Sequence, residues 1–219
     1  MWATAPRPCG CSQLPRLPEA SAPNAPVSTL RRRETPCAPI AVSMNDPDDG
    51  LGWLGERGRD GGIDRVPLPV PLGGLSLCGK HAIGPDPGRA LRRSGANTVV
   101  CLVEEHELRD RYPEYVDWLR LNAGVSALWF PVQDLHAPSL DAVRPLLGEM
   151  VRRIHAGEHL LVHCAAGIGR AGTIGVCLLM ELGMARDEAL AHVAGHRPMA
   201  GPEVGAQRAL VDHLAALRA

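Results

Sequence analysis

One short stretch of the sequence, residues 163–173, carries a cysteine, an arginine and three glycines in an arrangement that could bind and attack an anion. An apolar run at 160–162 comes directly before it and has the composition of a buried strand. Residues 174–180, directly after it, are apolar on nearly every side, which is typical of a helix inside a core. We therefore predict that Cys164 lies on a turn between a strand and a helix, with Arg170 six positions further on.

The turn that follows Cys164 is expected to bind an oxyanion. Backbone N–H groups of such a turn and the positive end of the next helix converge on one point. The same field favours a thiolate over a thiol, so the cysteine is predicted to be a nucleophile near neutral pH. Arg170 adds a planar guanidinium that matches two phosphate oxygens. The predicted phosphate-binding residues are Ala165, Ala166, Gly167, Ile168, Gly169 and Arg170.

This stretch resembles the signature loop of the cysteine-dependent protein tyrosine and dual-specificity phosphatases, in which His-Cys is followed by five residues, Arg, and then Ser or Thr. Every fixed position matches except the last, where Ala171 replaces the residue that bears a hydroxyl. The resemblance covers about residues 66–218 and implies a small phosphatase of bacterial type that forms a phosphocysteine intermediate and needs no metal or cofactor. Because the missing hydroxyl normally stabilises the departing thiolate, slow hydrolysis of that intermediate is expected.

A phosphatase of this kind also needs a proton donor for the leaving oxygen. Asp134 follows a predicted strand, lies between Pro131 and Pro138, and precedes Cys164 by thirty residues. The family carries its general acid on such a loop, in a Pro-x-x-Asp context, so the resemblance gives this role to Asp134. An aspartate that only caps a turn is the alternative. His136, two residues on, is expected to be a surface residue.

Three further residues acquire roles from the same resemblance. His163 is expected to help hold the thiolate through hydrogen bonds within the loop. Gln207 resembles the glutamine that places the attacking water in tyrosine phosphatases, although a polar residue on a helix edge is the alternative. Arg197 resembles an arginine that the family often carries before proline, and we interpret it as structural. Histidine pairs elsewhere in the chain lack a third ligand, so no metal site is predicted.

Strand and helix patterns alternate along the rest of the chain. Short apolar runs predict strands, the first of them at a sheet edge, at residues 74–78, 97–103, 127–130 and 160–162. Helical spacing predicts further helices at residues 89–94, 113–122, 139–156, 186–194 and 203–217. Because Pro145 interrupts the third of these, that helix is expected either to begin near Arg144 or to kink. The alternation predicts an α/β fold with a central, mostly parallel sheet flanked by helices, as in dual-specificity phosphatases.

Composition narrows the class of protein. A net charge of −1 and a pI near 6.7 argue against a protein that binds nucleic acid through bulk positive charge. The seven cysteines are irregularly spaced and do not suggest a disulfide framework. No apolar stretch is long enough to span a membrane, and no signal-peptide pattern opens the sequence. A cytoplasmic protein is expected, because a thiolate nucleophile needs a reducing compartment.

Residues 1–60 differ from the rest in being rich in Pro, Ala, Ser and Gly, with apolar residues scattered without a period. Such a segment cannot bury enough apolar surface to offset its ordering entropy, so we predict that it is disordered. Two interpretations of residues 1–43 stay open: a tail, passive or used for docking, and sequence upstream of a second start at Met44. The phosphatase domain is expected to occupy residues 66–219.

The variable positions of the signature loop bear on the substrate. Family members that act on inositol phospholipids tend to place lysines there, whereas Ala165, Ala166 and Ile168 carry no charge. This favours a phosphorylated protein, with phosphotyrosine first and phosphoserine or phosphothreonine left open, and Lys80 and His81 are candidates for the rim. The alternatives are a catalytically weak phosphate-binding module and a sulfur-transfer enzyme that uses a cysteine persulfide. Both account less well for a nucleophile, an arginine and an acid together.

Overall fold

A five-stranded sheet forms the centre of the described part of the chain. In a computed structural model of the chain, residues 60–218 are described, and their strands are arranged in the order β1-β2-β5-β3-β4. The strands are β1 (Ile63–Val66), β2 (Gly74–Gly79), β3 (Thr98–Cys101), β4 (Ala127–Trp129) and β5 (His159–Cys164). β1 pairs with β2 in antiparallel fashion, and every other pair is parallel. The predicted α/β class with a mostly parallel sheet is confirmed.

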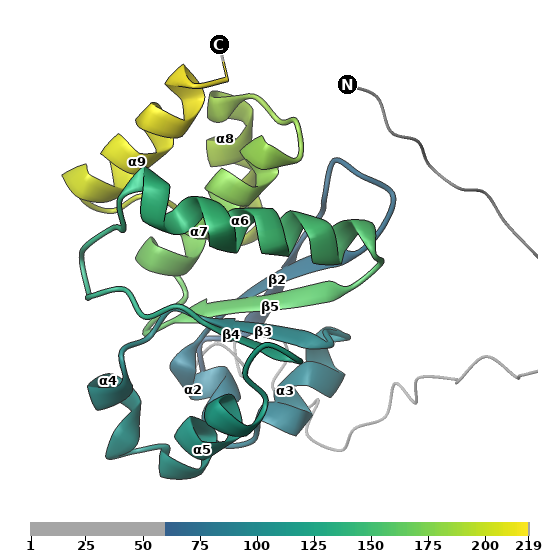
Figure 1. Cartoon of the computed structure of the whole chain (residues 1–219), viewed down its shortest axis with the longest axis vertical. Coiled ribbons are helices and arrows are strands. Elements are labelled where there is room, and N and C mark those ends of the chain that lie inside the picture. The colour runs from purple at the N-terminus through teal and green to yellow at the C-terminus, as the bar shows by residue number, and fades with distance from the viewer. Residues whose placement is uncertain (1–59, 219) are drawn as a thin grey trace, which may run out of the picture. The chain divides into compact units, whose positions relative to one another are not determined.

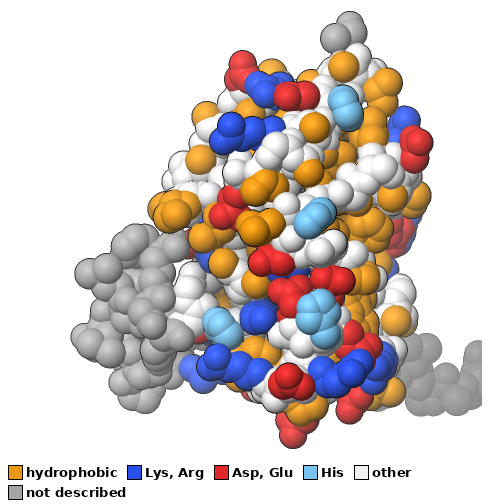
Figure 2. Space-filling view, turned by 90° about the vertical axis from the view of Figure 1, so that its left-hand side faces the viewer, with side chains coloured by type: hydrophobic (Ala, Val, Ile, Leu, Met, Phe, Trp, Pro, Cys, Tyr) orange, Lys and Arg blue, Asp and Glu red, His pale blue; other side chains and the backbone are white. Residues whose placement is uncertain are grey.

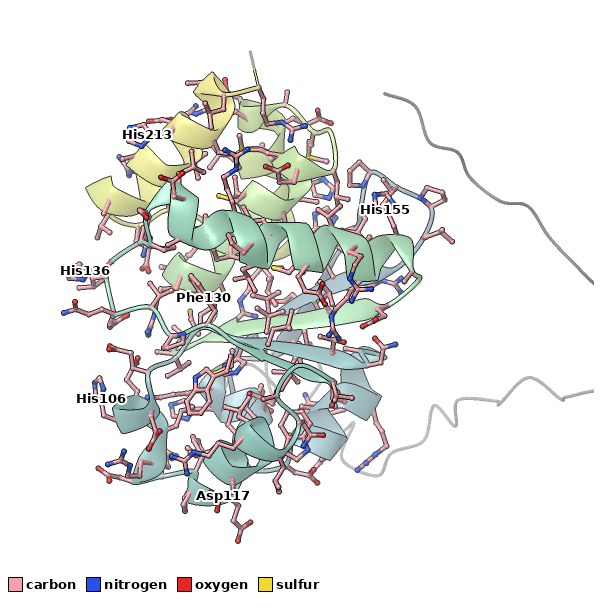
Figure 3. All side chains as sticks on the ribbon, viewed as in Figure 1. His106, Asp117, Phe130, His136, His155 and His213 are labelled. Atoms are coloured by element: carbon pink, nitrogen blue, oxygen red, sulfur yellow. The ribbon has the colours of Figure 1, made fainter. Side chains whose placement is uncertain are left out.

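Helices cover both faces of the sheet (Figure 1). One face carries α2 (Lys80–Ile83), α3 (Pro87–Ser94), α4 (Glu105–Arg109) and α5 (Pro113–Leu121), and the other carries α6 (Leu140–His155), α7 (Gly169–Glu181), α8 (Arg186–His196) and α9 (Gly205–Ala216). Successive side chains of a strand point to opposite faces, so Leu160 and Val162 of β5 enter one hydrophobic cluster and Leu161 enters the other. Phe130, just beyond β4, packs on the first cluster and points toward α6 and α7 (Figure 3).

Residues 74–78 form β2 inside the sheet, so the prediction of an edge strand there was wrong. The edge is β1, which pairs Ile63 with Cys78 and Val66 with Leu75. Its sequence, Ile-Asp-Arg-Val, has apolar residues only at its ends and gave no strand signal. Residues 1–59, nearly all of the segment predicted to be disordered, lie outside the described residues.

Pro145 lies inside α6, which runs from Leu140 to His155. Ser139 begins the helix, because its Oγ accepts a hydrogen bond from the backbone N–H of Ala142 at 3.3 Å. A start near Arg144 was therefore wrong. The short helices α2 and α4 were not predicted, because four or five residues are too few to show a helical period. Among the described helices, none combines the length and the apolar character needed to cross a bilayer.

The topology brings several loops to one edge of the sheet. β2, β3, β4 and β5 are parallel, so the segments that follow them all leave from the same side, which is on the left in Figure 1. In open α/β sheets this carboxyl edge is where ligands bind. The predicted catalytic loop follows β5, one of the three inner strands, and so lies at this edge.

Candidate active site

The loop after Cys164 closes tightly against the end of β2. The register of β2 and β5 places Cys164 opposite Gly79. Gly167 has a φ of +76°, and a Cβ atom there would lie 2.3 Å from the carbonyl of Cys78, so only glycine fits. The Gly167 N–H donates to Sγ of Cys164 at 3.2 Å, which directs an amide dipole at the sulfur. Residues 165–168 form the bend, and α7 begins at Gly169.

Arg170 lies in the first turn of α7 with only 3% of its surface exposed. Its Nη1 donates to Oε1 of Glu107 at 2.7 Å and to the carbonyl of Val132 at 2.7 Å. Burial alone would lower the pKa of Arg170, but the hydrogen-bonded carboxylate of Glu107 and the sulfur of Cys164 raise it overall. Within the described part of the chain, Nε of Arg170 is buried without a hydrogen-bond partner. That donor is available to an oxygen of a bound anion.

Glu107 was missed by the sequence analysis. It lies in α4, and Glu104 and Glu107 form a capping box at the start of that helix. Its Oε2 accepts from Nη2 of Arg170 at 3.0 Å, so both carboxylate oxygens hold the guanidinium. Burial raises the pKa of Glu107, but the hydrogen bond from Arg170 lowers it overall, which favours the charged form. The Glu-x-x-Glu spacing just after a buried strand was the signal that could have identified it.

Asp134 reaches the same arginine from the loop after β4. Its Oδ1 lies 3.0 Å from Nη2 of Arg170, and its side chain is 63% exposed. The ring of His136 is hydrogen-bonded through Nδ1 to the backbone oxygen of Asp134 at 2.8 Å, and His136 points outward at the edge of the molecule (Figure 3). The structure therefore brings the predicted acid to the predicted phosphate ligand and leaves His136 on the surface.

His163 is fully buried beneath the loop. Its Nε2 is 2.6 Å from the hydroxyl of Tyr115 in α5, and its Nδ1 has no hydrogen-bond partner among the described residues. Burial lowers the pKa of His163 to about 3, so the ring is neutral at physiological pH. A neutral imidazole leaves Arg170 as the cation that faces the sulfur.

Gln207 and Arg197 are both buried near the loop but make different contacts. Oε1 of Gln207 accepts from the N–H of Glu203 at 2.8 Å, and its Nε2 donates to the carbonyl of His136 at 3.3 Å. Arg197 donates to the carbonyls of Gly167 at 2.7 Å and Ala166 at 2.9 Å. Gln207 thus connects α9 to the acid loop, and Arg197 supports the phosphate-binding bend, consistent with a structural residue.

A third carboxylate, unnoticed in the sequence, lies at the start of α7. A Cβ atom on Gly169 would lie 1.9 Å from Oε2 of Glu203, so glycine makes room for this side chain. Figure 2 shows the carboxyl edge of the sheet, where acidic side chains gather between hydrophobic side chains above and basic ones below. Glu107 and Asp134 thus both pair with Arg170, and Glu203 lies beside the first residue of α7.

Lys80 and His81 differ in their relation to the site. The Lys80 N–H donates to the carbonyl of Ala165 at 3.0 Å, and its Nζ donates to the carbonyl of Glu107 at 2.9 Å. His81 instead lines a separate pocket of about 340 Å³ that contains no residue of the phosphate-binding bend. No group of three potential metal ligands occurs among residues 60–218.

Comparisons with known proteins identify the family of this domain. Residues 83–214 match the family described as PTP-SAK, Swiss Army Knife protein, DSP-PTPase phosphatase domain. The solved structure of Tk-PTP in its active form is 30% identical over 67% of this chain and 93% of that chain, with a TM-score of 0.52. No curated protein sequence matched the chain.

Two more distant structures share the fold. Human DUSP28 is 23% identical over 66% of this chain and 93% of its own, with a TM-score of 0.52. Kinase associated phosphatase, solved with its catalytic-site cysteine replaced by serine, is 17% identical over 72% of this chain and 93% of its own, with a TM-score of 0.56.

Proposed function

The chain belongs to the DSP-PTPase phosphatase domain family, and from that membership we propose that it removes phosphate from protein phosphotyrosine through a phosphocysteine intermediate. The family and the similar solved structures support a protein phosphatase. The substrate, the intermediate and the roles of individual residues are the proposal.

One observation carries the proposal. Asp134 and Arg170, thirty-six positions apart in the sequence, lie 3.0 Å apart at the mouth of the loop that holds Cys164. This contact supports a site in which Cys164 is the nucleophile, the Arg170 guanidinium binds phosphate oxygens and the exposed Asp134 carboxyl group donates a proton, as phosphoryl transfer to sulfur requires.

In the first step, the Cys164 thiolate attacks phosphorus and forms the S–P bond. The P–O bond to the leaving group breaks, and the leaving oxygen takes a proton from the carboxyl group of Asp134. The Nε donor of Arg170 and the N–H groups of the loop bind the phosphoryl oxygens, whose charge is spread out in the transition state. The substrate phosphate replaces Asp134 as the partner of Arg170 and so frees the acid to face the leaving oxygen.

In the second step, the Asp134 carboxylate takes a proton from a water molecule, and the water oxygen attacks phosphorus. The S–P bond breaks, inorganic phosphate leaves and the thiolate is regenerated. Gln207 lines a hollow of about 10 Å³ together with Arg170 and Thr173. That volume is on the scale of one water molecule, which supports a role for Gln207 in placing the attacking water.

The proposed substrate is a phosphorylated protein and the proposed reaction uses no metal ion. The four residues of the bend, Ala165, Ala166, Gly167 and Ile168, carry no charge, so the loop offers the single guanidinium of Arg170 to a single phosphate. This favours a phosphomonoester over a polyphosphorylated ligand. A reducing compartment such as the cytoplasm would keep the thiolate competent.

Hydrolysis of p-nitrophenyl phosphate by the full chain, with EDTA present, tests the proposal. The wild type is expected to be active, Cys164→Ser inactive, and rapid quenching of the wild type during turnover to show phosphate bound to Cys164. Activity of the Cys164→Ser variant would refute the mechanism. If the wild type bound phosphate but hydrolysed no ester, the phosphate-binding module would be the correct interpretation.

A further inference from the structure

Leu135 and Met199 have an unusual backbone conformation. Among the described residues other than glycine, they alone have a positive φ, of +57° and +70° respectively. Left-handed backbone is unfavourable for residues with a Cβ atom and is normally occupied by glycine. Both side chains are also large, apolar and exposed, with 56% of Leu135 and 78% of Met199 accessible. Neither strain nor exposure is explained by packing of the core.

Leu135 follows the proposed acid directly. Asp134, its neighbour, contacts Arg170, and the carbonyl of His136, on its other side, accepts from the Gln207 side chain. The residues on both sides of Leu135 are thus fixed to the catalytic region. Leu135 itself lies on the loop between β4 and α6, and its side chain is exposed.

Met199 lies on the segment between α8 and α9, which is fixed to the phosphate-binding bend. Arg197, two residues before it, donates to the carbonyls of Ala166 and Gly167. Gly201, two residues after it, donates to the carbonyl of Ile168 at 3.3 Å. Met199 therefore lies on a segment that is hydrogen-bonded to the bend on both sides of it.

We propose that Leu135 and Met199 are specificity-determining residues that form an apolar rim against the aromatic ring of phosphotyrosine; this inference rests on the proposed function. A phosphate bound in the loop places the group to which it is esterified at the mouth. For phosphotyrosine that group is an aromatic ring, which gains free energy by covering apolar side chains. The side chain of phosphoserine has one carbon, so it gains almost no free energy from contact with apolar side chains. At the carboxyl edge of the sheet, hydrophobic side chains lie next to the gathered acidic side chains (Figure 2).

Backbone strain supports this assignment. Residues held in sparsely populated backbone regions cluster at functional sites, where the strain is tolerated for what the side chain does. Glycine at either position would relieve the strain and remove the side chain. Alanine would keep the strain and remove most of the side chain. The two substitutions therefore separate the contribution of the backbone from that of the contact.

The test measures kcat and KM of the full chain on two peptides of one sequence that carry phosphotyrosine or phosphoserine. Leu135→Ala and Met199→Ala are expected to raise KM for the phosphotyrosine peptide about fivefold, or about 1 kcal/mol, and to leave KM for the phosphoserine peptide unchanged. Leu121→Ala, an exposed leucine of α5 with ordinary backbone angles, is the matched control and should change neither.

Thermal unfolding gives a second, independent readout. Met199→Gly is expected to raise Tm by about 2–4 °C relative to Met199→Ala, because glycine adopts the left-handed backbone without strain. Both variants should show the same rise in KM for phosphotyrosine. An equal change in KM for both peptides, or no change for either, would overturn the inference while leaving the proposed function intact. Failure of the wild type to hydrolyse either peptide would instead refute the proposed function, and this inference with it.

Discussion

Both carboxylate oxygens of Glu107 bind the guanidinium of Arg170, at 2.7 Å and 3.0 Å. The pair joins α4, on one face of the sheet, to the first turn of α7, on the other. Because a planar guanidinium has a fixed fork of donors, its orientation decides which N–H groups face the loop. Glu107 therefore sets how Arg170 presents its remaining donors to phosphate, and we regard it as a positioning residue.

Glu107→Gln should weaken phosphate binding without unfolding the protein. The amide retains an acceptor for Arg170 but loses the charge, so the guanidinium is held less firmly. We expect kcat/KM to fall about tenfold or more and the inhibition constant for inorganic phosphate to rise in parallel. Glu105→Gln is the control, because Glu105 in the same helix forms ion pairs with Arg109 and Arg120. A fall in Tm with unchanged inhibition by phosphate would indicate a purely structural pair.

Asp134→Asn should reduce activity according to the basicity of the leaving oxygen. General acid catalysis contributes about 10²–10⁴-fold, and its contribution is largest for esters whose leaving oxygen must be protonated. We expect a loss of about 100-fold on a phosphotyrosine peptide and a smaller loss on p-nitrophenyl phosphate. Asp141→Asn, at an exposed aspartate in the first turn of α6, serves as control. An equal loss on every leaving group would contradict the assignment.

Ala171→Ser should speed breakdown of the phosphocysteine. Ala171 is fully buried in the first turn of α7, and no hydroxyl stands at that position. The neighbouring hydroxyl of Thr173 does not substitute, because it donates to the carbonyl of Gly169 at 2.7 Å. A serine hydroxyl could stabilise the departing thiolate, so kcat should rise several-fold and the pre-steady-state burst should shrink. Burst kinetics identical to those of the wild type would contradict this prediction.

His163 should make the fold sensitive to mild acid. Burial lowers its pKa to about 3, against 6.5 for the exposed ring, so below pH 6.5 the unfolded chain binds a proton that the folded protein does not. Its contribution to the free energy of unfolding is therefore constant above pH 6.5 and decreases as pH falls toward 3. The loss by pH 5 is about 2 kcal/mol.

Urea unfolding between pH 5 and pH 7 measures this dependence. His163→Gln keeps a hydrogen-bonding group for Tyr115 but does not titrate, so its stability should vary less with pH than that of the wild type. The comparison cancels the contributions of other histidines, among them His81 and His159, whose pKa values are also lowered by burial. Identical pH profiles for the two proteins would contradict the prediction.

The sequence by itself determined the class of fold and was enough to propose the chemistry of the loop that carries Cys164 and Arg170. The spacing from Cys164 to Arg170, between the apolar runs at residues 160–162 and 174–180, is local information. This pattern can be recognised in the sequence because almost every residue of β5 and α7 is buried. The same is true of the mostly parallel sheet, since short apolar runs that alternate with helical patterns permit few other arrangements.

Only the tertiary structure decided which distant residues surround that loop. Glu107 lies in the short helix α4, Glu203 lies just before α9, and neither is near Cys164 in the sequence. β1, and not β2, forms the edge of the sheet. It pairs with β2 through its backbone, and such pairing does not require an apolar pattern. The left-handed backbone at Leu135 and Met199 is likewise absent from any local pattern, because leucine and methionine do not favour it and only the surrounding contacts impose it.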